Sequence, residues 1–462
     1  MIDVLLTHSN HVFNDRKQVQ KMQPYPPLQT LLAASVLRRA GFAVALCDVA
    51  FADPEETFQE KLDELQPRLV AVCEDGFNFL SKMCLIRNRE VSFWMAGIAR
   101  ERGIPIAVHS PDASDHVAGY LQAGFNYVLL GEVESTLVEL AGRKSLTDIA
   151  GLVYPNGSVD KPHYNAPRGL RAELDSLPQP AWDLVDVAPY RNAWLAAHGH
   201  FSLNMISIRG CPFRCNWCAK PVYGNSYRVR DARLVADEMF FLKTRLRPDR
   251  LWFADDIFAL SGRWAREFAD AVVSRGAQIP FKIQSRCDLM TRGTVAALKQ
   301  AGCAEVWMGA ESGSQQVLDA MEKGIKVKDV YRARENLARH GIRACLFLQF
   351  GYPGEGWDEI EATIRMVRDV QPDDIGVSVS YPLPGTRFFQ LVSQQLGRTA
   401  NWSESGDLSM MFQGAFSSDF YRALADALHL EVRQKENEAA LQDAWERVDT
   451  MSGRAMLAKG VC

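Results

Sequence analysis

The chain has 462 residues, of which 47% are apolar and 23% charged, and its formal net charge is −4. This length exceeds one ordinary core, so two or three domains are expected. The weak net charge, without a long basic block, argues against nucleic-acid binding, and the lack of any run of about 18 uncharged apolar residues argues against a membrane span. A strand-like run begins at Val4 with no leader before it, so a complete cytoplasmic protein is expected.

Residues 1–145 alternate short apolar runs with segments of helical periodicity. This alternation predicts a parallel sheet covered on both faces, in a five-stranded, doubly wound, Rossmann-like domain. The expected strands are 4–7, 43–49, 69–74, 104–109 and 127–130.

Polar residues follow four of these strands, where a sheet of this type binds its ligands. Each group taken alone is typical of a solvated loop. No Gly-x-Gly-x-x-Gly pattern is present, so dinucleotide binding has little support. The four groups are Thr7-His8-Ser9-Asn10, Glu74-Asp75-Gly76, His109-Ser110 and Gly131-Glu132-Val133-Glu134.

Residues 146–200 are expected to form a connector. Residues 153–159 predict a hairpin, because Asn156-Gly157 can supply positive φ angles. Residues 174–182 contain two prolines and predict an extended bridge.

Three cysteines lie in the run Cys211-Pro212-Phe213-Arg214-Cys215-Asn216-Trp217-Cys218, after an apolar strand expected at 204–209. Thiolates on one short loop can converge on one inorganic centre, and soft sulfur ligands select zinc, copper(I) or iron–sulfur. Three protein thiolates leave one corner of a four-iron cluster without a protein ligand. A second molecule can then bind the metal directly, as at the open position of a catalytic zinc site.

Two other interpretations of the cysteine run are open. A structural zinc site needs four closed ligands, and His198 or His200 could supply the fourth. A disulfide framework fits poorly, because the ten cysteines of the chain are scattered and no signal peptide precedes them.

The run from Cys211 to Cys218 closely resembles the signature of the radical S-adenosylmethionine (radical SAM) enzymes, in which an aromatic residue precedes the third cysteine, as Trp217 does here. The resemblance covers residues 200–390. It implies that Cys211, Cys215 and Cys218 hold a [4Fe–4S] cluster and that SAM chelates the fourth iron. One electron, from a donor such as flavodoxin or ferredoxin, would then cleave SAM to a 5′-deoxyadenosyl radical.

The strand-end groups of the first domain resemble the cobalamin-binding domain that precedes the radical SAM domain in one large subfamily. The proline pair that opens the first helix and the Gly-Glu turn after the last strand match that pattern. The resemblance implies that cobalamin is contacted by Thr7, His8, Pro27, Glu74, His109, Gly131 and Glu132.

The run Asp115-His116-Val117-Ala118-Gly119 departs from the Asp-x-His-x-x-Gly motif of methionine-synthase-type domains, because the aspartate stands one place too close to the histidine. We expect a helix start capped by Asp115 and no cobalt ligand from His116. His8 and His109 stay open as cobalt ligands.

Residues 201–390 contain six strand–helix repeats, which predict a partial (β/α)6 barrel of the TIM type with its chemistry at the carboxyl ends of the strands. Leu234 and Met239 are expected on the buried face of one helix, and Ser261 is expected to cap another. The expected strands are 205–208, 251–254, 281–284, 305–308, 344–350 and 375–381.

Polar residues also follow the second and third strands of this barrel. Asp255 and Asp256 form either a turn with a helix cap or a carboxylate site for the SAM ammonium. Arg286 either pairs with the SAM carboxylate in bidentate fashion or pairs with Asp288.

The later strands end in further candidate groups. Glu311 and Ser312 can bond ribose or amino groups. Gly351 and Gly354 correspond to the family's glycine-rich turn beside the adenosyl group, and the backbone from Tyr381 onward could bracket the adenine.

Residues 391–462 are expected to form a helical cap, with helices at 418–434 and 436–449. The segment 402–412 is either part of that cap or a substrate lid. Cys462 is expected to be an incidental thiol.

The resemblance implies an enzyme that cleaves SAM at its cluster and, with cobalamin, C-methylates an unactivated carbon of a small molecule. Apolar residues near the cap favour a lipid, polyketide or tetrapyrrole substrate. The segment 402–412 resembles the branch that contains the anaerobic oxidative cyclase of bacteriochlorophyll synthesis and the hopanoid methylases, so oxidation or cyclisation without methylation is an alternative. A non-catalytic cobalamin or redox sensor is a second alternative.

Overall fold

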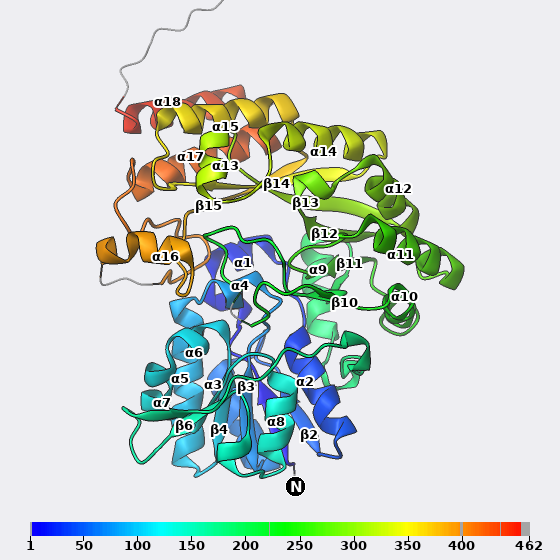
Figure 1. Cartoon of the computed structure of the whole chain (residues 1–462), viewed down its shortest axis with the longest axis vertical. Helices are drawn as coiled ribbons and strands as arrows, with labels where there is room; N and C mark the ends of the chain where they lie inside the picture. The colour runs from blue at the N-terminus through cyan, green and yellow to red at the C-terminus, as the bar shows by residue number, and fades with distance from the viewer. Residues whose placement is uncertain (1, 221, 398–400, 435, 454–462) are drawn as a thin grey trace, which may run out of the picture. The chain divides into compact units, whose positions relative to one another are not determined.

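The computed structural model describes residues 2–220, 222–397, 401–434 and 436–453, and Figure 1 labels its helices and strands. The chain divides into two compact units. Unit 1 comprises Met1–Pro212, Ala219–Asp256 and Asn401–Asp407, and unit 2 comprises Phe213–Cys218, Ile257–Ala400 and Leu408–Cys462.

Unit 1 contains the predicted doubly wound sheet. Its first five strands are parallel in the order β2-β1-β3-β4-β5, and the antiparallel strands β6 and β7 extend one edge. The connections reverse direction between β1 and β3, which is where sheets of this order bind ligands. The strands are β1 (Val4–Thr7), β2 (Val44–Cys47), β3 (Leu69–Cys73), β4 (Ile106–His109), β5 (Tyr127–Leu129), β6 (Leu152–Pro155) and β7 (Pro162–Tyr164).

Helices cover both faces of this sheet (Figure 1). Because successive residues of a strand point to opposite faces, Leu5 packs into a core with α3, α5 and α7, whereas Val4 and Leu6 pack into a second core with α2 and α8. The helices are α1 (Arg16–Lys21), α2 (Leu28–Arg39), α3 (Pro54–Leu65), α4 (Phe79–Lys82), α5 (Ile86–Glu101), α6 (Pro111–Asp115), α7 (Val117–Ala123) and α8 (Val133–Ala141).

The connector and the first strand–helix repeat also belong to unit 1. β8 pairs in parallel with β11, and the short strands β9 and β10 pair in antiparallel fashion. The elements are α9 (Ala188–His198), β8 (Ser202–Met205), β9 (Ile208–Arg209), β10 (Arg228–Val229), α10 (Ala232–Phe241) and β11 (Arg250–Phe253).

Unit 2 continues the alternation of parallel strands and helices. Its strands β12 to β15 pair in parallel in chain order, and helices α11, α12, α14 and α15 connect or precede them. The strands are β12 (Phe281–Ser285), β13 (Cys303–Glu311), β14 (Arg343–Phe350) and β15 (Asp374–Val379). The helices are α11 (Gly262–Arg275), α12 (Arg292–Ala301), α13 (Gln315–Ala320), α14 (Val327–Arg339), α15 (Trp357–Val370), α16 (Arg387–Val392), α17 (Ser418–Arg433) and α18 (Glu438–Met451).

The predicted fold class is confirmed: a doubly wound sheet is followed by parallel strand–helix repeats and by C-terminal helices close to the expected positions. Ser261 caps α11, as predicted, by accepting a hydrogen bond from the N–H of Trp264. Cys462 lies outside the described residues.

Three local predictions were wrong. The strand expected at 205–208 is divided, because the N–H groups of Ser207 and Ile208 bind Asp255 instead of a neighbouring strand. A helix does start in the run 115–119, since α7 begins at Val117, but its N-cap position is His116, because Asp115 is the last residue of α6.

The third error concerns Leu234, which is 40% exposed although its neighbours Val235 and Met239 are buried. The hairpin expected at 153–159 is confirmed, since β6 and β7 pair in antiparallel fashion and Gly157, in the loop 156–161 between them, has a φ of 75°.

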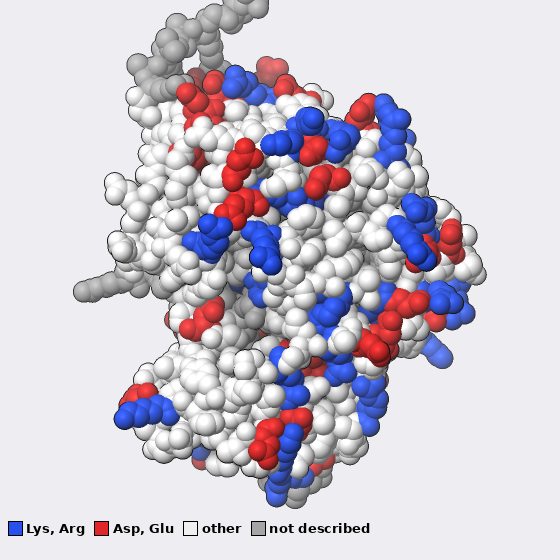
Figure 2. Space-filling model, viewed as in Figure 1, with Lys and Arg blue, Asp and Glu red and all other residues white. Residues whose placement is uncertain are grey.

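On the face drawn in Figure 2, basic and acidic side chains are interspersed and form no continuous basic patch. No helix in the described part of the chain is long and apolar enough to cross a membrane.

Candidate active site

The three cysteines of the signature differ from the other described cysteines in exposure. Cys211, Cys215 and Cys218 are partly exposed, whereas the remaining six are buried. Burial raises the pKa of the buried thiols, for example to about 12 for Cys287 and Cys303. A thiol of such high pKa is a poor metal ligand at neutral pH, so the signature loop presents the thiols suited to an inorganic centre.

The signature loop fits an iron–sulfur centre in the type and number of its donors, since it offers three accessible thiols within eight consecutive residues. Within the described ranges, no three Cys, His, Asp or Glu side chains are already gathered as a metal site. The zinc alternative loses support, because His198 and His200, its possible fourth ligands, each contact a backbone carbonyl. The Nε2 atom of His198 lies 2.9 Å from the Lys21 carbonyl oxygen, and the Nδ1 atom of His200 lies 3.0 Å from the His198 carbonyl oxygen.

Asn216, between the second and third cysteines, fastens the loop to three parts of unit 2. Its side-chain Nδ2 donates to the Ala320 carbonyl at 2.7 Å, and its Oδ1 accepts from the Tyr352 hydroxyl at 3.0 Å. Its backbone N–H donates to the Met321 carbonyl, and its carbonyl accepts from the Phe388 N–H, both at 3.0 Å. The polar groups of this residue therefore set the position of the loop, a role that the sequence analysis did not assign.

Trp217 packs at the edge of an apolar cluster in unit 2. The buried members of this cluster include Tyr352, Phe388 and Phe412. An aromatic residue before the third cysteine therefore contributes apolar contact area that helps to fix the loop. Phe412 comes from the C-terminal cap, so the cap packs near the loop.

Asp255 follows β11, and its carboxylate accepts hydrogen bonds from the segment that precedes Cys211. Its Oδ1 accepts from the N–H groups of Ser207 at 2.8 Å and Ile208 at 3.1 Å, and its Oδ2 accepts from the Ser207 hydroxyl. Burial raises the pKa of Asp255 to about 7, although these hydrogen bonds oppose the rise. Its neighbour Asp256 instead pairs with Lys82 at 2.5 Å.

Arg286 adopts the second of the two arrangements expected for it. Its Nε lies 3.0 Å from Oδ1 of Asp288, and its Nη1 donates to the Lys323 carbonyl at 2.8 Å. Its guanidinium carbon lies 3.7 Å from the ring centroid of Phe213, in the signature loop. In this arrangement the guanidinium is fully engaged by protein groups.

Glu311 and Ser312, at the end of β13, also bond protein groups. Lys323 approaches Glu311, with 2.6 Å between Nζ and Oε1. The Ser312 hydroxyl lies 3.1 Å from that of Thr363, and Gly313 donates its N–H to the same threonine oxygen at 2.9 Å. These contacts hold the end of β13 against α15.

The glycine-rich turn after β14 is packed tightly on one side. A Cβ at Gly351 would meet Sδ of Met410 at 2.8 Å, whereas a Cβ at Gly354 would meet no atom within 4 Å. Glu355 accepts the Gly351 N–H, and burial raises the pKa of this carboxyl to about 8. The Tyr381 carbonyl, after β15, accepts the N–H of Leu383 at 3.0 Å.

In unit 1, the carboxyl ends of β1, β3 and β4 carry buried polar atoms without a hydrogen-bond partner among the described residues. These atoms are Ser9 Oγ, Glu74 Oε2 and His109 Nδ1. Such atoms are costly to bury unless a ligand or water satisfies them. They fit a ligand rich in amide groups, as cobalamin is, at the predicted end of the sheet.

The two candidate histidines of unit 1 differ in their partners. His8 uses both ring nitrogens, since Nε2 lies 3.0 Å from Asp48 and Nδ1 accepts the N–H of Asn10 at 3.2 Å. His109 bonds the Gly131 carbonyl through Nε2 at 2.9 Å. Burial lowers the pKa of His109, so the ring is neutral and its Nδ1 carries a lone pair.

The remaining candidates of unit 1 have structural partners. Thr7 donates its hydroxyl to the Cys47 carbonyl at 2.8 Å, and Pro27 stands at the start of α2. Glu132 pairs with Arg228 at 2.6 Å and, at 3.4 Å, with the fully buried Arg209.

Arg209 is a second residue that the sequence analysis missed. It stands two residues before Cys211 and pairs with Glu134 as well as Glu132. Its guanidinium carbon lies 5.2 Å from the ring centroid of Tyr223. A charged residue inside the apolar strand at 204–209 was the available signal, since a buried arginine requires paired carboxylates.

Residues 205–367 match the sequence profile of the Radical SAM superfamily. This range includes the signature loop and the strands from β9 to β14. The chain therefore contains a radical SAM domain, as the cysteine run predicted.

The chain is also similar to several curated proteins. It is 30% identical to an uncharacterized methyltransferase of Pyrococcus horikoshii, over 60% of each chain. It is 25% identical to the hopanoid C-3 methylase of Methylococcus capsulatus, over 80% of this chain and 69% of the relative. It is also 25% identical to the anaerobic magnesium-protoporphyrin IX monomethyl ester cyclase of Cereibacter sphaeroides, over 80% of this chain and 61% of the relative. The chain thus spans less than two thirds of the first and third of these relatives.

Two solved structures share the fold. The radical SAM methyltransferase TsrM from Kitasatospora setae, with cobalamin and a [4Fe–4S] cluster bound, gives a TM-score of 0.69 at 21% identity over 85% of this chain and 78% of that one. The cobalamin-dependent SAM radical enzyme OxsB gives a TM-score of 0.66 at 17% identity over 85% of this chain and 55% of that one. The predicted resemblance to cobalamin-dependent radical SAM enzymes is confirmed.

Proposed function

We propose that this protein is a cobalamin-dependent radical SAM methyltransferase that acts on an unactivated carbon of a small molecule. The observation that carries the proposal is the signature loop, whose three cysteines alone among those described are partly exposed. Cys211, Cys215 and Cys218 are the proposed iron ligands. When bound, the cluster supplies one electron to cleave SAM, and cobalamin supplies a methyl group.

The residues around the loop would hold it still during this chemistry. Asn216 fixes the loop to the ends of α13 and β14 through its side chain. Asp255 fixes the backbone before Cys211. Such fixed positioning matters because a displacement of about 1 Å at a reacting centre can cost a factor of about 10² in rate.

SAM is proposed to contact the strand-end groups of the repeats. The candidates are the residues named from the sequence. Arg286 and Glu311 would exchange their present partners for the amino-acid part of SAM. The proposed SAM residues are Trp217, Asp255, Asp256, Arg286, Glu311, Ser312, Gly351, Gly354 and Tyr381.

Cobalamin is proposed to bind at the carboxyl ends of β1, β3, β4 and β5. The unsatisfied atoms of Ser9, Glu74 and His109 support this position. The free lone pair of His109 makes it a better candidate than His8 for a contact with the cofactor, because both nitrogens of His8 already have partners. We propose no histidine ligand to cobalt from the Asp115-His116 run.

The proposal is tested by anaerobic reconstitution with iron and sulfide, followed by reaction with dithionite and SAM carrying a trideuterated methyl group. The expected result is 5′-deoxyadenosine together with a product that gains a labelled methyl group. Cys215→Ser should abolish both, whereas Cys303→Ser, at a buried thiol, should retain the cluster. Full activity of Cys215→Ser would refute the assignment.

Oxidation or cyclisation without methylation is the second candidate, because the chain is as similar to the anaerobic cyclase as to the hopanoid methylase. The same assay separates the two functions. Deoxyadenosine formed with a product that lacks the label would favour the cyclase-like reaction, and no cleavage of SAM under any condition would favour a sensor.

The substrate class proposed is an apolar polycyclic molecule, such as a lipid or tetrapyrrole. The names of the relatives support this class, and so does the apolar cap segment around Phe412. Comparison of apolar metabolites from cells with and without the protein tests it, and an unchanged profile would exclude it. A flavodoxin or ferredoxin is the proposed electron donor.

A further inference from the structure

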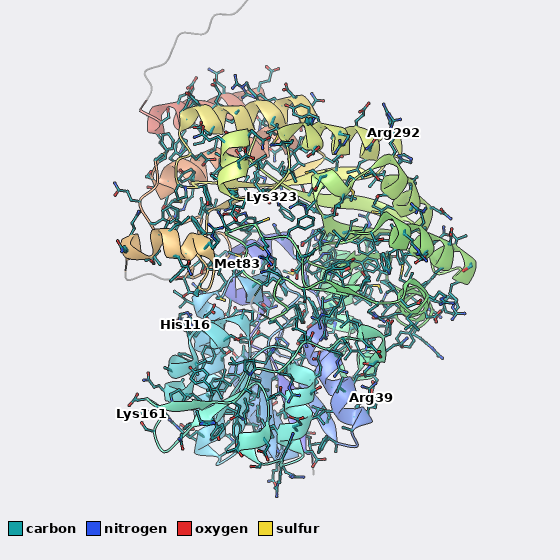
Figure 3. All side chains as sticks on the ribbon, viewed as in Figure 1. Arg39, Met83, His116, Lys161, Arg292 and Lys323 are labelled. Atoms are coloured by element: carbon teal, nitrogen blue, oxygen red, sulfur yellow. The ribbon has the colours of Figure 1, made fainter. Side chains whose placement is uncertain are left out.

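Two buried cations of unit 2 lie against the two aromatic residues of the signature loop. The guanidinium carbon of Arg286 lies 3.7 Å from the ring centroid of Phe213, and Nζ of Lys323 lies 5.9 Å from that of Trp217. Lys323 is only 7% exposed. Figure 3 shows Lys323 away from the outer edge of unit 2, whereas Arg292 lies at that edge.

The backbone around Lys323 is built to keep its ammonium in place. Glu311, its partner, has a φ of 60°, which is a left-handed conformation that few side chains other than glycine favour. A Cβ at Gly309 would meet both Glu311 Oε1 and Lys323 Nζ at 2.5 Å. Any side chain at position 309 would therefore displace the ion pair. Strain of this kind persists where function requires it.

The two cations are also connected. Arg286 donates from Nη1 to the Lys323 carbonyl at 2.8 Å, so the lysine backbone is held by the residue that covers Phe213. Burial would lower the pKa of Lys323, but the charges of Glu311 and then Cys215 outweigh it, and the pKa is raised. The ion pair with Glu311, at 2.6 Å, therefore keeps the Lys323 ammonium protonated.

We propose that Lys323 is a positioning residue whose fixed positive charge raises the reduction potential of the iron–sulfur cluster held by the signature loop. The inference rests on the proposed function. A cluster on three thiolates gains one negative charge when it accepts one electron from a low-potential donor. A buried ammonium nearby stabilises the reduced form more than the oxidised form, since charges interact strongly away from water.

The test is an EPR-monitored redox titration of the full-length, anaerobically reconstituted protein without SAM. Lys323→Met should lower the midpoint potential, with about a tenfold smaller reduced-to-oxidised ratio at a fixed potential (about 59 mV for one electron). Lys323→Arg keeps the positive charge, so its midpoint potential should stay close to that of the wild type. Lys326→Met is the matched control, because the Lys326 side chain is 62% exposed on the same segment, and it should leave the potential unchanged.

Glu311→Gln separates an electrostatic role from a merely structural one. It removes the carboxylate, and the titration is run at about pH 6, far below the ordinary lysine pKa of 10.5, so that Lys323 keeps its proton without its partner. The midpoint potential should then rise. If only packing mattered, the midpoint potentials of Lys323→Met and Glu311→Gln would shift in the same direction. If Lys323→Met does not take up a cluster, the midpoint potential of Glu311→Gln tests the inference by itself. An unchanged or lowered potential in Glu311→Gln would overturn the inference.

Failure of the inference is distinguishable from failure of the proposed function. If the wild-type protein takes up no iron–sulfur cluster, the proposed function fails and the inference fails with it. If the wild type loads a cluster whose potential is the same in Lys323→Met and Lys326→Met, only the role of Lys323 is refuted.

Discussion

Replacing Asn216 by alanine should loosen the signature loop without altering a thiol. The variant loses two side-chain hydrogen bonds, to Ala320 and from Tyr352, at about 1 kcal/mol each. The two former partners remain within reach of each other, since the Tyr352 hydroxyl also lies 3.1 Å from the Ala320 carbonyl. No full penalty for an unpaired buried group is therefore expected, and the loss should be about 2 kcal/mol.

The assay is the rate at which the reconstituted protein loses iron to a chelator under anaerobic conditions. If the loop must open to release iron, about 2 kcal/mol corresponds to roughly 30-fold faster loss, at 1.4 kcal/mol per tenfold. Tyr352→Phe should show a smaller effect of the same sign, because it removes one of the two bonds. Asn225→Ala, at an exposed asparagine bonded to Lys220, is the control. Equal rates in Asn216→Ala and Asn225→Ala would refute the reasoning.

Three further predictions concern stability measured by urea unfolding. Arg209→Met removes the cationic partner of the buried Glu134, whereas Glu132 keeps Arg228, and should cost about 3–5 kcal/mol. Arg233→Met, at an 84%-exposed side chain, should cost under about 1 kcal/mol; similar losses would contradict the buried network. Gly351→Ala should destabilise more than Gly354→Ala, because both have positive φ but only the first meets Met410; equal losses would show that the contact is unimportant. Glu355 has a pKa of about 8 in the folded protein, whereas the ordinary value is 4.5, so the unfolded chain releases this proton at lower pH than the folded protein does. The wild type should therefore lose stability relative to Glu355→Gln as pH rises from 5 to 8. Parallel curves of stability against pH for the two proteins would exclude the raised pKa.

Much of the fold followed from periodicity. Buried parallel strands are short and continuously apolar, and this pattern placed β1 at its observed residues and the other strands of the first sheet within a few residues of theirs. The signature cysteines were proposed as cluster ligands from their spacing on one short loop and from the family resemblance. Both kinds of signal are local in the chain.

The errors arose where distant residues decide local structure. Asp255, far along the chain, takes up the N–H groups of Ser207 and Ile208 and thereby ends β8. The roles of Asn216 and Lys323 were missed for the same reason, because their partners come from other elements of unit 2. No spacing rule reveals such contacts.

The central claim is that the three thiols of the signature loop hold an iron–sulfur cluster with one iron open to SAM. Its most direct test is the EPR spectrum of the anaerobically reconstituted, dithionite-reduced protein, recorded with and without SAM alongside iron and zinc analysis. The account predicts four irons per chain and a reduced-cluster signal whose g-values change when SAM is added. Zinc in the loop, no iron after reconstitution, or a cluster signal that SAM leaves unchanged would contradict it.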